Sequence, residues 1–85
     1  MYTVYILKTS GNTLYTGITN NLEKRLNEHK SHTKKSAKYM RSFDSFELVL
    51  TEKCNSKSDA LKREIAIKKL TRKQKDSLIK LYVGI

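Results

Sequence analysis

Residues 2–19 have the sequence YTVYILKTSGNTLYTGIT, which holds the strongest structural signals in the chain. The segment Tyr2–Lys8 is rich in β-branched and aromatic residues and is apolar on both faces, which is typical of a central strand. Residues 10–12 (SGN) have the composition of a turn, and Thr13–Thr19 has the composition of a second strand. The stretch therefore predicts an antiparallel β-hairpin.

The register of this hairpin decides where its tyrosines point. With an odd number of residues in the turn, Tyr5 lies opposite Gly17. Leu7 then lies opposite Tyr15, and both tyrosine rings share one face, whereas a slip of one residue separates them. Because Gly17 has no side chain, a ligand or the backbone can approach the sheet closely there. From the pattern alone, packing of both tyrosines in an ordinary core is the simpler interpretation.

Beyond the hairpin, the pattern predicts three helices and one further strand, in the order β-β-α-β-α-α. This order is typical of a small α+β sandwich, with a three-stranded antiparallel sheet and helices packed on one face. The 85 residues are enough for one core, so residues 1–85 are expected to form a single domain. The predicted elements after the hairpin are a helix from the N-cap Asn20, with Glu23 at N3, to about Lys30; a strand at Phe46–Cys54; a helix at Ser56–Leu70, with Ser56 and Asp59 in a capping-box arrangement; and a helix from a Thr71–Gln74 capping box through about Leu81.

Composition narrows the class of protein. The single cysteine, Cys54, cannot form an intrachain disulfide or a zinc site of four Cys and His ligands. No apolar run reaches the roughly 18–20 residues that span a bilayer, and the first residues lack the pattern of a signal peptide. We therefore expect a cytoplasmic protein without a membrane partner, monomeric by default.

The net charge of +10, from 18 Lys and Arg against 8 Asp and Glu, points to an anionic partner. Nucleic acid is the commonest such partner, with anionic membrane and ribosomal surfaces as rivals and a solubility surface as the simplest interpretation. Lysines outnumber arginines by 14 to 4, which favours attraction to phosphate over recognition of bases. Binding is expected to be sensitive to salt and weakly sequence-specific.

Each of the first two predicted helices places charged residues beside its apolar stripe. In the second helix, Glu64 falls near the middle of an arc formed by Ala60, Leu61, Ile65 and Ile67, where a carboxylate is costly unless it is paired or binds something. An ordinary ion pair with Lys68, four residues on, is an equally good explanation.

In the first helix, Arg25 and His29 run along one edge of the stripe formed by Leu22 and Leu26. The planar fork of an arginine matches two phosphate oxygens, although an arginine lying over the core edge with its head in water is the more frequent case. A single histidine such as His29 is more often a surface or capping residue than a functional one.

Taken together, these residues resemble the GIY-YIG nuclease domain, most closely its compact stand-alone bacterial branch. Residues 3–5 (TVY) stand where that family has Gly-Ile-Tyr, and residues 15–17 (YTG) match Tyr-Ile-Gly. Arg25 and His29 fit the helix that follows, and residues 60–64 (ALKRE) resemble the helix with the metal-binding glutamate. The chain departs from the family in the missing first glycine, in having Ile18 and Thr19 where several members have a lysine, and in lacking a clear C-terminal asparagine, for which Asp76 is the nearest polar residue.

The resemblance implies hydrolysis of phosphodiester bonds with one divalent cation. Glu64 would bind Mg²⁺ or Mn²⁺, and Tyr5 would deprotonate or orient the attacking water, a role that Tyr15 could share or exchange. Arg25 would neutralise charge on the phosphoryl oxygens, and His29 would bind phosphate or assist proton transfer near neutral pH. The expected nucleic-acid contacts are Gly17, Lys34, Lys35, Lys38 and Arg41.

The first prediction is thus a metal-dependent endonuclease-like domain that acts on DNA with weak sequence specificity, in DNA repair or recombination. The alternatives are a nucleic-acid-binding module that cleaves little or nothing, and a basic protein associated with RNA or the ribosome. DNA is favoured over RNA as the partner. Because the predicted domain takes up the 85 residues and leaves none for a separate targeting domain, we expect structure-selective or weakly selective action, or recruitment by a protein partner.

Overall fold

Three antiparallel strands form one sheet with the strand order β2-β1-β3, which makes the first strand the central one. The computed structural model describes residues 1–30 and 45–83. The element order β-β-α-β-α-α confirms the expected α+β fold. The elements are β1 (Tyr2–Thr9), β2 (Leu14–Thr19), α1 (Leu22–Lys30), β3 (Phe46–Cys54), α2 (Lys57–Lys68) and α3 (Arg72–Val83).

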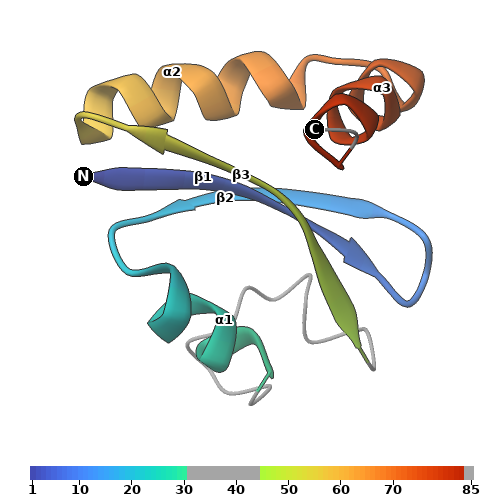
Figure 1. Ribbon diagram of the computed structural model, residues 1–85, viewed down its shortest axis with the longest axis horizontal. Coiled ribbons are helices and arrows are strands. Elements are labelled where there is room, and N and C mark those ends of the chain that lie inside the picture. Colours follow the sequence, from blue (N-terminus) through green and yellow to red (C-terminus); the bar gives the residue numbers. More distant parts are fainter. Residues whose placement is uncertain (31–44, 84–85) are drawn as a thin grey trace.

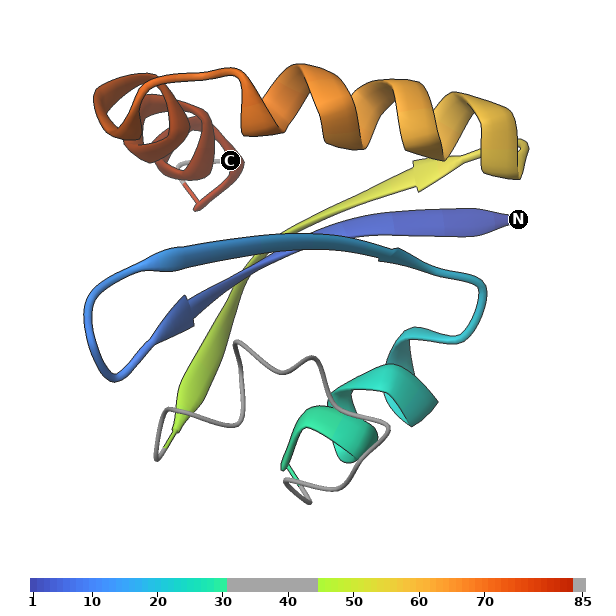
Figure 2. The same cartoon turned by 180° about the vertical axis from the view of Figure 1, so that it is seen from behind.

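Helices cover both faces of the sheet, so the expectation that they gather on one face is wrong. Helices α2 and α3 lie on one side and α1 lies on the other (Figure 1), and the view from behind shows the same two layers (Figure 2). The physical reason is the composition of β1, whose four residues at positions 4–7 are all fully buried. A central strand that is apolar on both faces needs a cover on both, because each exposed apolar side chain costs about 1.5–3 kcal/mol.

The alternating side chains of β1 therefore enter two separate cores. Val4 and Ile6 point toward α2 and α3 and pack with Leu50, Ala60 and Ile67. On the opposite face, Tyr5 and Leu7 form the second core under α1. Tyr15, Leu22, Leu26 and Phe46 pack against this second core.

The start of α1 is one residue later than predicted, because Asn21 rather than Asn20 caps it. The Asn21 side-chain oxygen accepts a hydrogen bond from the Lys24 backbone N–H at 3.1 Å. The hydroxyl of Thr19 accepts the Asn21 N–H at 3.1 Å, which holds the chain in a turn before the helix begins. Both asparagines are good caps, so local sequence alone does not separate them.

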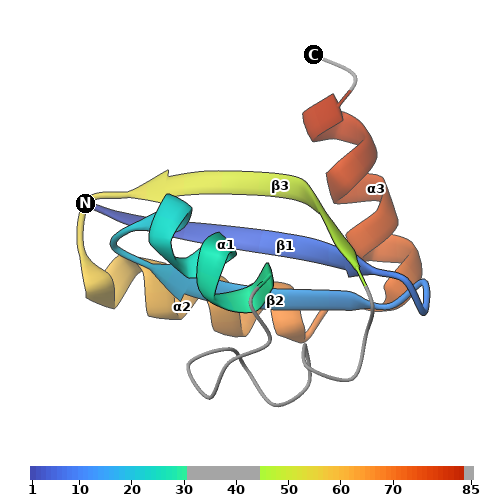
Figure 3. The same cartoon turned by 90° about the horizontal axis from the view of Figure 1, so that it is seen from below.

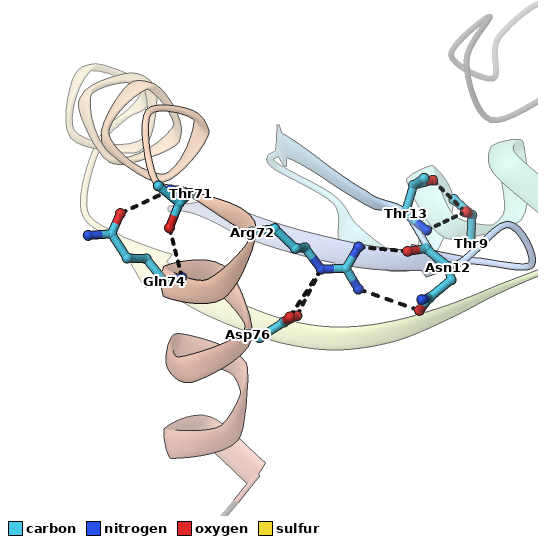
Figure 4. Close-up of polar contacts among 7 residues, drawn as sticks. All are labelled: Thr9, Asn12, Thr13, Thr71, Arg72, Gln74 and Asp76. Carbon is cyan, nitrogen blue, oxygen red and sulfur yellow. Dashed lines mark hydrogen bonds and ion pairs between the residues drawn. The ribbon is translucent and has the colours of Figure 1, made fainter.

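The two later caps agree with the prediction. Ser56 caps α2 by accepting the Asp59 backbone N–H at 3.1 Å. At the start of α3, the Thr71 N–H donates to the Gln74 side chain at 2.9 Å, and the Gln74 N–H donates to the Thr71 hydroxyl at 3.2 Å. This reciprocal pair, drawn in Figure 4, is a complete capping box.

The N-terminal end of α3 is tied to the β1–β2 turn by Arg72. Its guanidinium donates to the backbone carbonyl of Asn12 at 2.6 Å and to two oxygens of Asp76 at 3.0 and 3.2 Å (Figure 4). Asn12 adopts a positive φ of 61°, a conformation that asparagine tolerates better than most residues. Asp76 is the nearest polar residue to the position where many family members have an asparagine. Here its carboxylate binds Arg72 and so helps to hold α3 in place.

A β-bulge in β3 changes which face its residues occupy. Ile6 pairs with Leu50 but Leu7 pairs with Leu48, so β3 has one extra residue at Val49. Counted from Leu50 by simple alternation, Phe46 would belong to the face of α2 and α3. The bulge instead places Phe46 under α1, against the second core.

Candidate active site

The hydroxyl end of Tyr5 lies directly over Gly17. The two residues pair across the hairpin, and Leu7 pairs with Tyr15, which confirms the register expected for an odd-length turn. A Cβ atom added to Gly17 would lie 2.6 Å from the Tyr5 Oη and 2.7 Å from its Cζ. The absence of a side chain at Gly17 therefore makes room for the ring of Tyr5 rather than for a free approach to the sheet. The phenol extends across β2 because of this space.

A buried hydrogen bond joins Tyr5 to α1. The Tyr5 Oη lies 3.1 Å from the Nε2 of His29, whose side chain is 1% exposed. The imidazole is enclosed by aromatic rings, with Tyr15 and Phe46 packed edge-on at centroid distances of 5.6 and 6.0 Å. Tyr5 and Tyr15 are themselves 6.3 Å apart between centroids. His29 is thus an interior residue and not a surface or capping histidine.

Burial and, to a smaller extent, the positive charge of Arg25 lower the pKa of His29 to about 4, although the charge of Glu28 acts in the opposite direction. The imidazole is therefore neutral at pH 7, so a phosphate-binding imidazolium, one of the two expected roles, does not exist in the free protein. Its Nδ1 is buried and has no hydrogen-bond partner within residues 1–30 and 45–83. A neutral imidazole can still accept or donate one proton at Nε2.

The environment also makes Tyr5 a weaker acid, not a stronger one. Burial raises the pKa of Tyr5 to about 12, and the charges of Tyr15 and Glu64 act in the same direction. A hydrogen bond and an attraction from Arg25 lower it, but burial outweighs them. Tyr5 is consequently a neutral phenol at pH 7, and a resident tyrosinate base is not formed in the free protein.

Arg25 is the permanent positive charge of the site. Burial lowers the pKa of its guanidinium, yet hydrogen bonds to Tyr5, Glu28 and Tyr15 outweigh burial and raise the pKa overall. Glu28, at 3.2 Å and 20% side-chain exposure, is a partner that the sequence analysis did not single out. Its signal was available, because a carboxylate three residues after an arginine lies on the same helix face. The guanidinium therefore contacts both tyrosines, and the Arg25 side chain is mostly shielded from water.

Glu64 approaches from the other side of the sheet. It lies on α2, and its side chain is only 17% exposed, on the stripe between Ala60 and Ile67, both fully buried. Leu61 and Ile65, expected on the same apolar arc, are 39% and 53% exposed, because the helix covers a narrow sheet with only one stripe. Lys68 Nζ lies 3.5 Å from one Glu64 oxygen, so the ion pair considered in the sequence analysis does form.

The carboxylate of Glu64 nevertheless belongs to the surroundings of Tyr5. Its charge is close enough to raise the pKa of that phenol. Figure 3 shows how this is achieved, with α2 running along the β2 side of the sheet and α1 on the opposite face. The ring of Tyr5 lies over Gly17 of β2 on one face of the sheet, and α2, which carries Glu64, packs against β2 on the other face. The charge of Glu64 therefore acts on the phenol across the edge strand.

The donor set fits a loosely held divalent cation. Within the described residues, no group of three or more His, Cys, Asp or Glu side chains could bind a metal ion. Glu64 offers one partly buried carboxylate, of which the Lys68 pair engages one oxygen. Mg²⁺ is commonly bound by one or two carboxylates, with water and substrate phosphate as the other ligands. A single glutamate is enough for that mode of binding.

The structure thus brings together Tyr5, Tyr15, Gly17, Arg25 and His29, with Glu64 across the edge strand. Phe46 completes the enclosure of His29, a contact that the sequence pattern does not predict because alternation along β3 places Phe46 on the other face. The proposed backbone contacts Lys34, Lys35, Lys38 and Arg41 lie outside the described residues. No helix in the described ranges is both long and apolar enough to cross a membrane.

The comparisons with known proteins assign this fold to a family of nuclease-type catalytic domains. The pattern of the GIY-YIG catalytic domain matches residues 1–77. A UPF0213 protein of Syntrophus aciditrophicus is 53% identical over 77 residues, which cover 91% of this chain and 87% of the relative. The UPF0213 protein of Desulfotalea psychrophila is 47% identical over 77 residues, covering 91% of this chain and 69% of that protein.

A solved structure gives the same result. The solution NMR structure of the UPF0213 protein BH0048 from Bacillus halodurans has a TM-score of 0.62 and 38% sequence identity. The match covers 95% of this chain and 85% of that chain. The chain therefore belongs to the GIY-YIG family, within its UPF0213 group.

Proposed function

We propose that the protein is a metal-dependent endonuclease that hydrolyses phosphodiester bonds in DNA with little sequence specificity. The observation that carries the proposal is the position of the Tyr5 hydroxyl. It is hydrogen-bonded to the neutral His29 at 3.1 Å, contacted by the guanidinium of Arg25, and within the influence of the Glu64 carboxylate. A proton acceptor, a permanent cation and a carboxylate around one hydroxyl are the groups that hydrolysis of a phosphate diester requires.

In the proposed reaction, Tyr5 relays a proton and does not persist as a tyrosinate. Because its pKa is about 12, the phenol passes its own proton to His29 Nε2 as it takes one from the attacking water. The neutral imidazole is ready to accept that proton at pH 7. The oxygen that leaves the phosphate takes its proton from solvent, and His29 returns the relayed proton through Tyr5 after the product has left, so each group ends in its starting protonation state.

Arg25 stabilises the charge that builds up on the phosphoryl oxygens. Its guanidinium is held by hydrogen bonds to Tyr5, Tyr15 and Glu28, so it needs little reorganisation in the transition state. Glu64 would hold Mg²⁺ or Mn²⁺, which supplies Lewis-acid activation of the phosphodiester when bound. Tyr15 packs on Tyr5 and His29 and positions both rings.

The charge of the chain supports a nucleic-acid partner. A net charge of +10 attracts polyanions, and the excess of lysine favours contacts to phosphate over contacts to bases. We propose DNA over RNA as the substrate, a role in DNA repair or recombination, action as a monomer in the cytoplasm, and a protein partner where a particular site must be selected.

Two observations favour a second function, a nucleic-acid-binding module with little or no cleavage. Glu64 is already ion-paired with Lys68, and burial makes the Tyr5 phenol a weak acid. A site of this kind could bind phosphate through Arg25 and still turn over slowly. RNA or the ribosome would then be as suitable a partner as DNA.

The deciding experiment is a cleavage assay with a matched control. Purified wild-type protein, Glu64→Gln and Glu47→Gln are incubated with labelled single-stranded, duplex and branched DNA and with RNA, in Mg²⁺ or Mn²⁺. Glu47 is an exposed carboxylate of β3, so its variant should cut like wild type. Glu64→Gln should lose about 100-fold or more in rate, the scale for removal of one charged stabilising group.

Binding is measured separately, in the presence of a chelator. Glu64→Gln should bind the preferred substrate at least as well as wild type, because the change removes a negative charge. Unchanged cleavage by Glu64→Gln would refute the metal role. Salt-sensitive binding with no cleavage of any substrate by wild type would support the binding module instead.

A further inference from the structure

The catalytic cluster continues along β2 into a second, basic pocket. This open pocket has a volume of about 340 Å³ and is lined by Leu14, Tyr15, Thr16, Lys68 and Lys75. Tyr15 therefore borders both the catalytic cluster and the pocket. The other lining residues come from β2 and from the two helices on the opposite face of the sheet.

The distance between the two sites suits a nucleic-acid strand. Lys68 lies one helical turn beyond Glu64 on α2, which corresponds to about 6 Å along the helix axis. The axial rise of a DNA strand is about 3.4 Å per nucleotide, so the stretch of α2 from Glu64 to Lys68 spans roughly two nucleotides. A strand that places one phosphate at Glu64 therefore brings a neighbouring phosphate to the basic pocket.

Lys75 is the available cation of this pocket. It is only partly exposed, and within the described residues it forms no ion pair with a carboxylate. Lys68, in contrast, is engaged with Glu64. A phosphate oxygen in the pocket would give the Lys75 ammonium a charge-assisted hydrogen bond that no carboxylate of the described residues provides.

The anchor of α3 keeps Lys75 in place. Arg72, one turn earlier on α3, is bound to the Asn12 carbonyl in the β1–β2 turn and to Asp76 (Figure 4). This contact ties the first turn of α3 to the hairpin just before Leu14, where β2 begins. Within the described residues β2 pairs only with β1, so it is an edge strand, and edge strands present backbone N–H groups that can also donate to phosphate.

We propose that the pocket formed by Lys68 and Lys75 binds a backbone phosphate one or two nucleotides from the phosphate that is cut, and so directs the substrate strand along β2. The inference rests on the proposed function and specifies the path of its substrate. Its ligand class is a phosphodiester backbone, without regard to base.

The test uses Lys75→Gln, with Lys75→Arg as the charge-conserving variant and Lys80→Gln as the matched control. Lys80 is an exposed lysine of the same helix and does not line the pocket. Binding of a labelled DNA oligonucleotide is measured in a chelator over salt from about 50 to about 200 mM, a range in which phosphate contacts dominate. Lys75→Gln should bind several-fold more weakly and reduce the log–log salt slope by about 0.9, the value for one lost duplex phosphate contact.

Lys75→Arg and Lys80→Gln should keep the wild-type slope. In cleavage, Lys75→Gln should raise KM and leave kcat unchanged, because Lys75 does not contact the reacting phosphate. If wild type binds DNA in a salt-dependent way but Lys75→Gln and Lys80→Gln behave alike, the pocket is refuted and the proposed function stands. If wild type binds no DNA at all, the proposed function fails and takes this inference with it.

Discussion

Replacing Gly17 with alanine tests the central contact of the site. A Cβ at this position would lie 2.7 Å from the Cζ of Tyr5, whereas carbon atoms pack best at about 3.5–4.0 Å, so the ring must withdraw by about 1 Å. Tyr5 is only 1% exposed, so a shift of its ring must displace packed neighbours. Such overpacking typically costs about 1–3 kcal/mol.

The hydrogen bond from Tyr5 to His29, 3.1 Å long, would be lost in this movement, at a further cost of about 1 kcal/mol. Alanine loses less backbone conformational entropy than glycine on folding into a strand, which offsets about 0.5–1 kcal/mol of this cost. We therefore expect Gly17→Ala to lower the free energy of unfolding by about 2 kcal/mol. For a domain of this size the melting temperature would fall by about 8–16 °C.

Urea unfolding, followed by circular dichroism, measures this change in stability. A cleavage assay shows whether the displaced Tyr5 phenol still supports hydrolysis. Gly11→Ala is the control, because Gly11 is exposed in the turn and has no positive φ. A double-mutant cycle isolates the cause, since Gly17→Ala should be nearly neutral in a Tyr5→Leu background. An equal loss in both backgrounds would refute the reasoning, because the penalty would then come from the backbone of β2.

Two further predictions concern acid and the anchor of α3. Stability should rise between pH 4 and pH 6.5, because unfolded His29 binds a proton below its ordinary pKa of about 6.5 whereas the folded imidazole resists protonation down to about 4. The contribution of neutral His29 to the free energy of unfolding is about 3 kcal/mol above about pH 6.5, and it is lost as the pH falls to about 4. The urea midpoint of His29→Gln should therefore depend less on pH than that of wild type, and parallel curves would contradict the assignment. Arg72→Ala should lower the free energy of unfolding in urea by about 1 kcal/mol, since the side chain is 44% exposed but its guanidinium donates a hydrogen bond to the Asn12 carbonyl. Lys80→Ala, an equally basic change in the same helix, should cost less, and equal losses would argue against the anchor.

Most of the fold could be predicted from local signals in the sequence. The hairpin and the caps at Ser56 and Thr71 could be predicted, whereas two registers of the hairpin stayed open and the structure has the one expected for an odd-length turn. The family resemblance then identified which residues gather on the face of Tyr5. The placement of α1 on the opposite face from α2 was missed, although the all-apolar stretch of β1 already required a cover on each side.

The rest depended on tertiary packing that no local pattern carries. The bulge that brings Phe46 to His29 shifts β3 by one residue, and nothing in its composition marks the position. The neutral state of His29 and the raised pKa of Tyr5 follow from burial under α1, which a helical projection does not measure. For Glu64 the two alternatives were not exclusive, because the pair with Lys68 and the nearness to Tyr5 coexist.

The position of the candidate residues along the chain has a consequence for the order in which the site is assembled. Tyr5, Tyr15, Arg25 and His29 all come from the hairpin and the helix that follows it, so their contacts close short loops, whereas Glu64 belongs to the second half of the chain. During synthesis, the N-terminal part emerges first, and the two tyrosines, the arginine and the histidine are made well before the carboxylate. Under the proposed mechanism, a nascent chain would contain its phosphate-binding groups before it contains the carboxylate, and it would gain the ability to cut only after α2 is made and docks on the sheet.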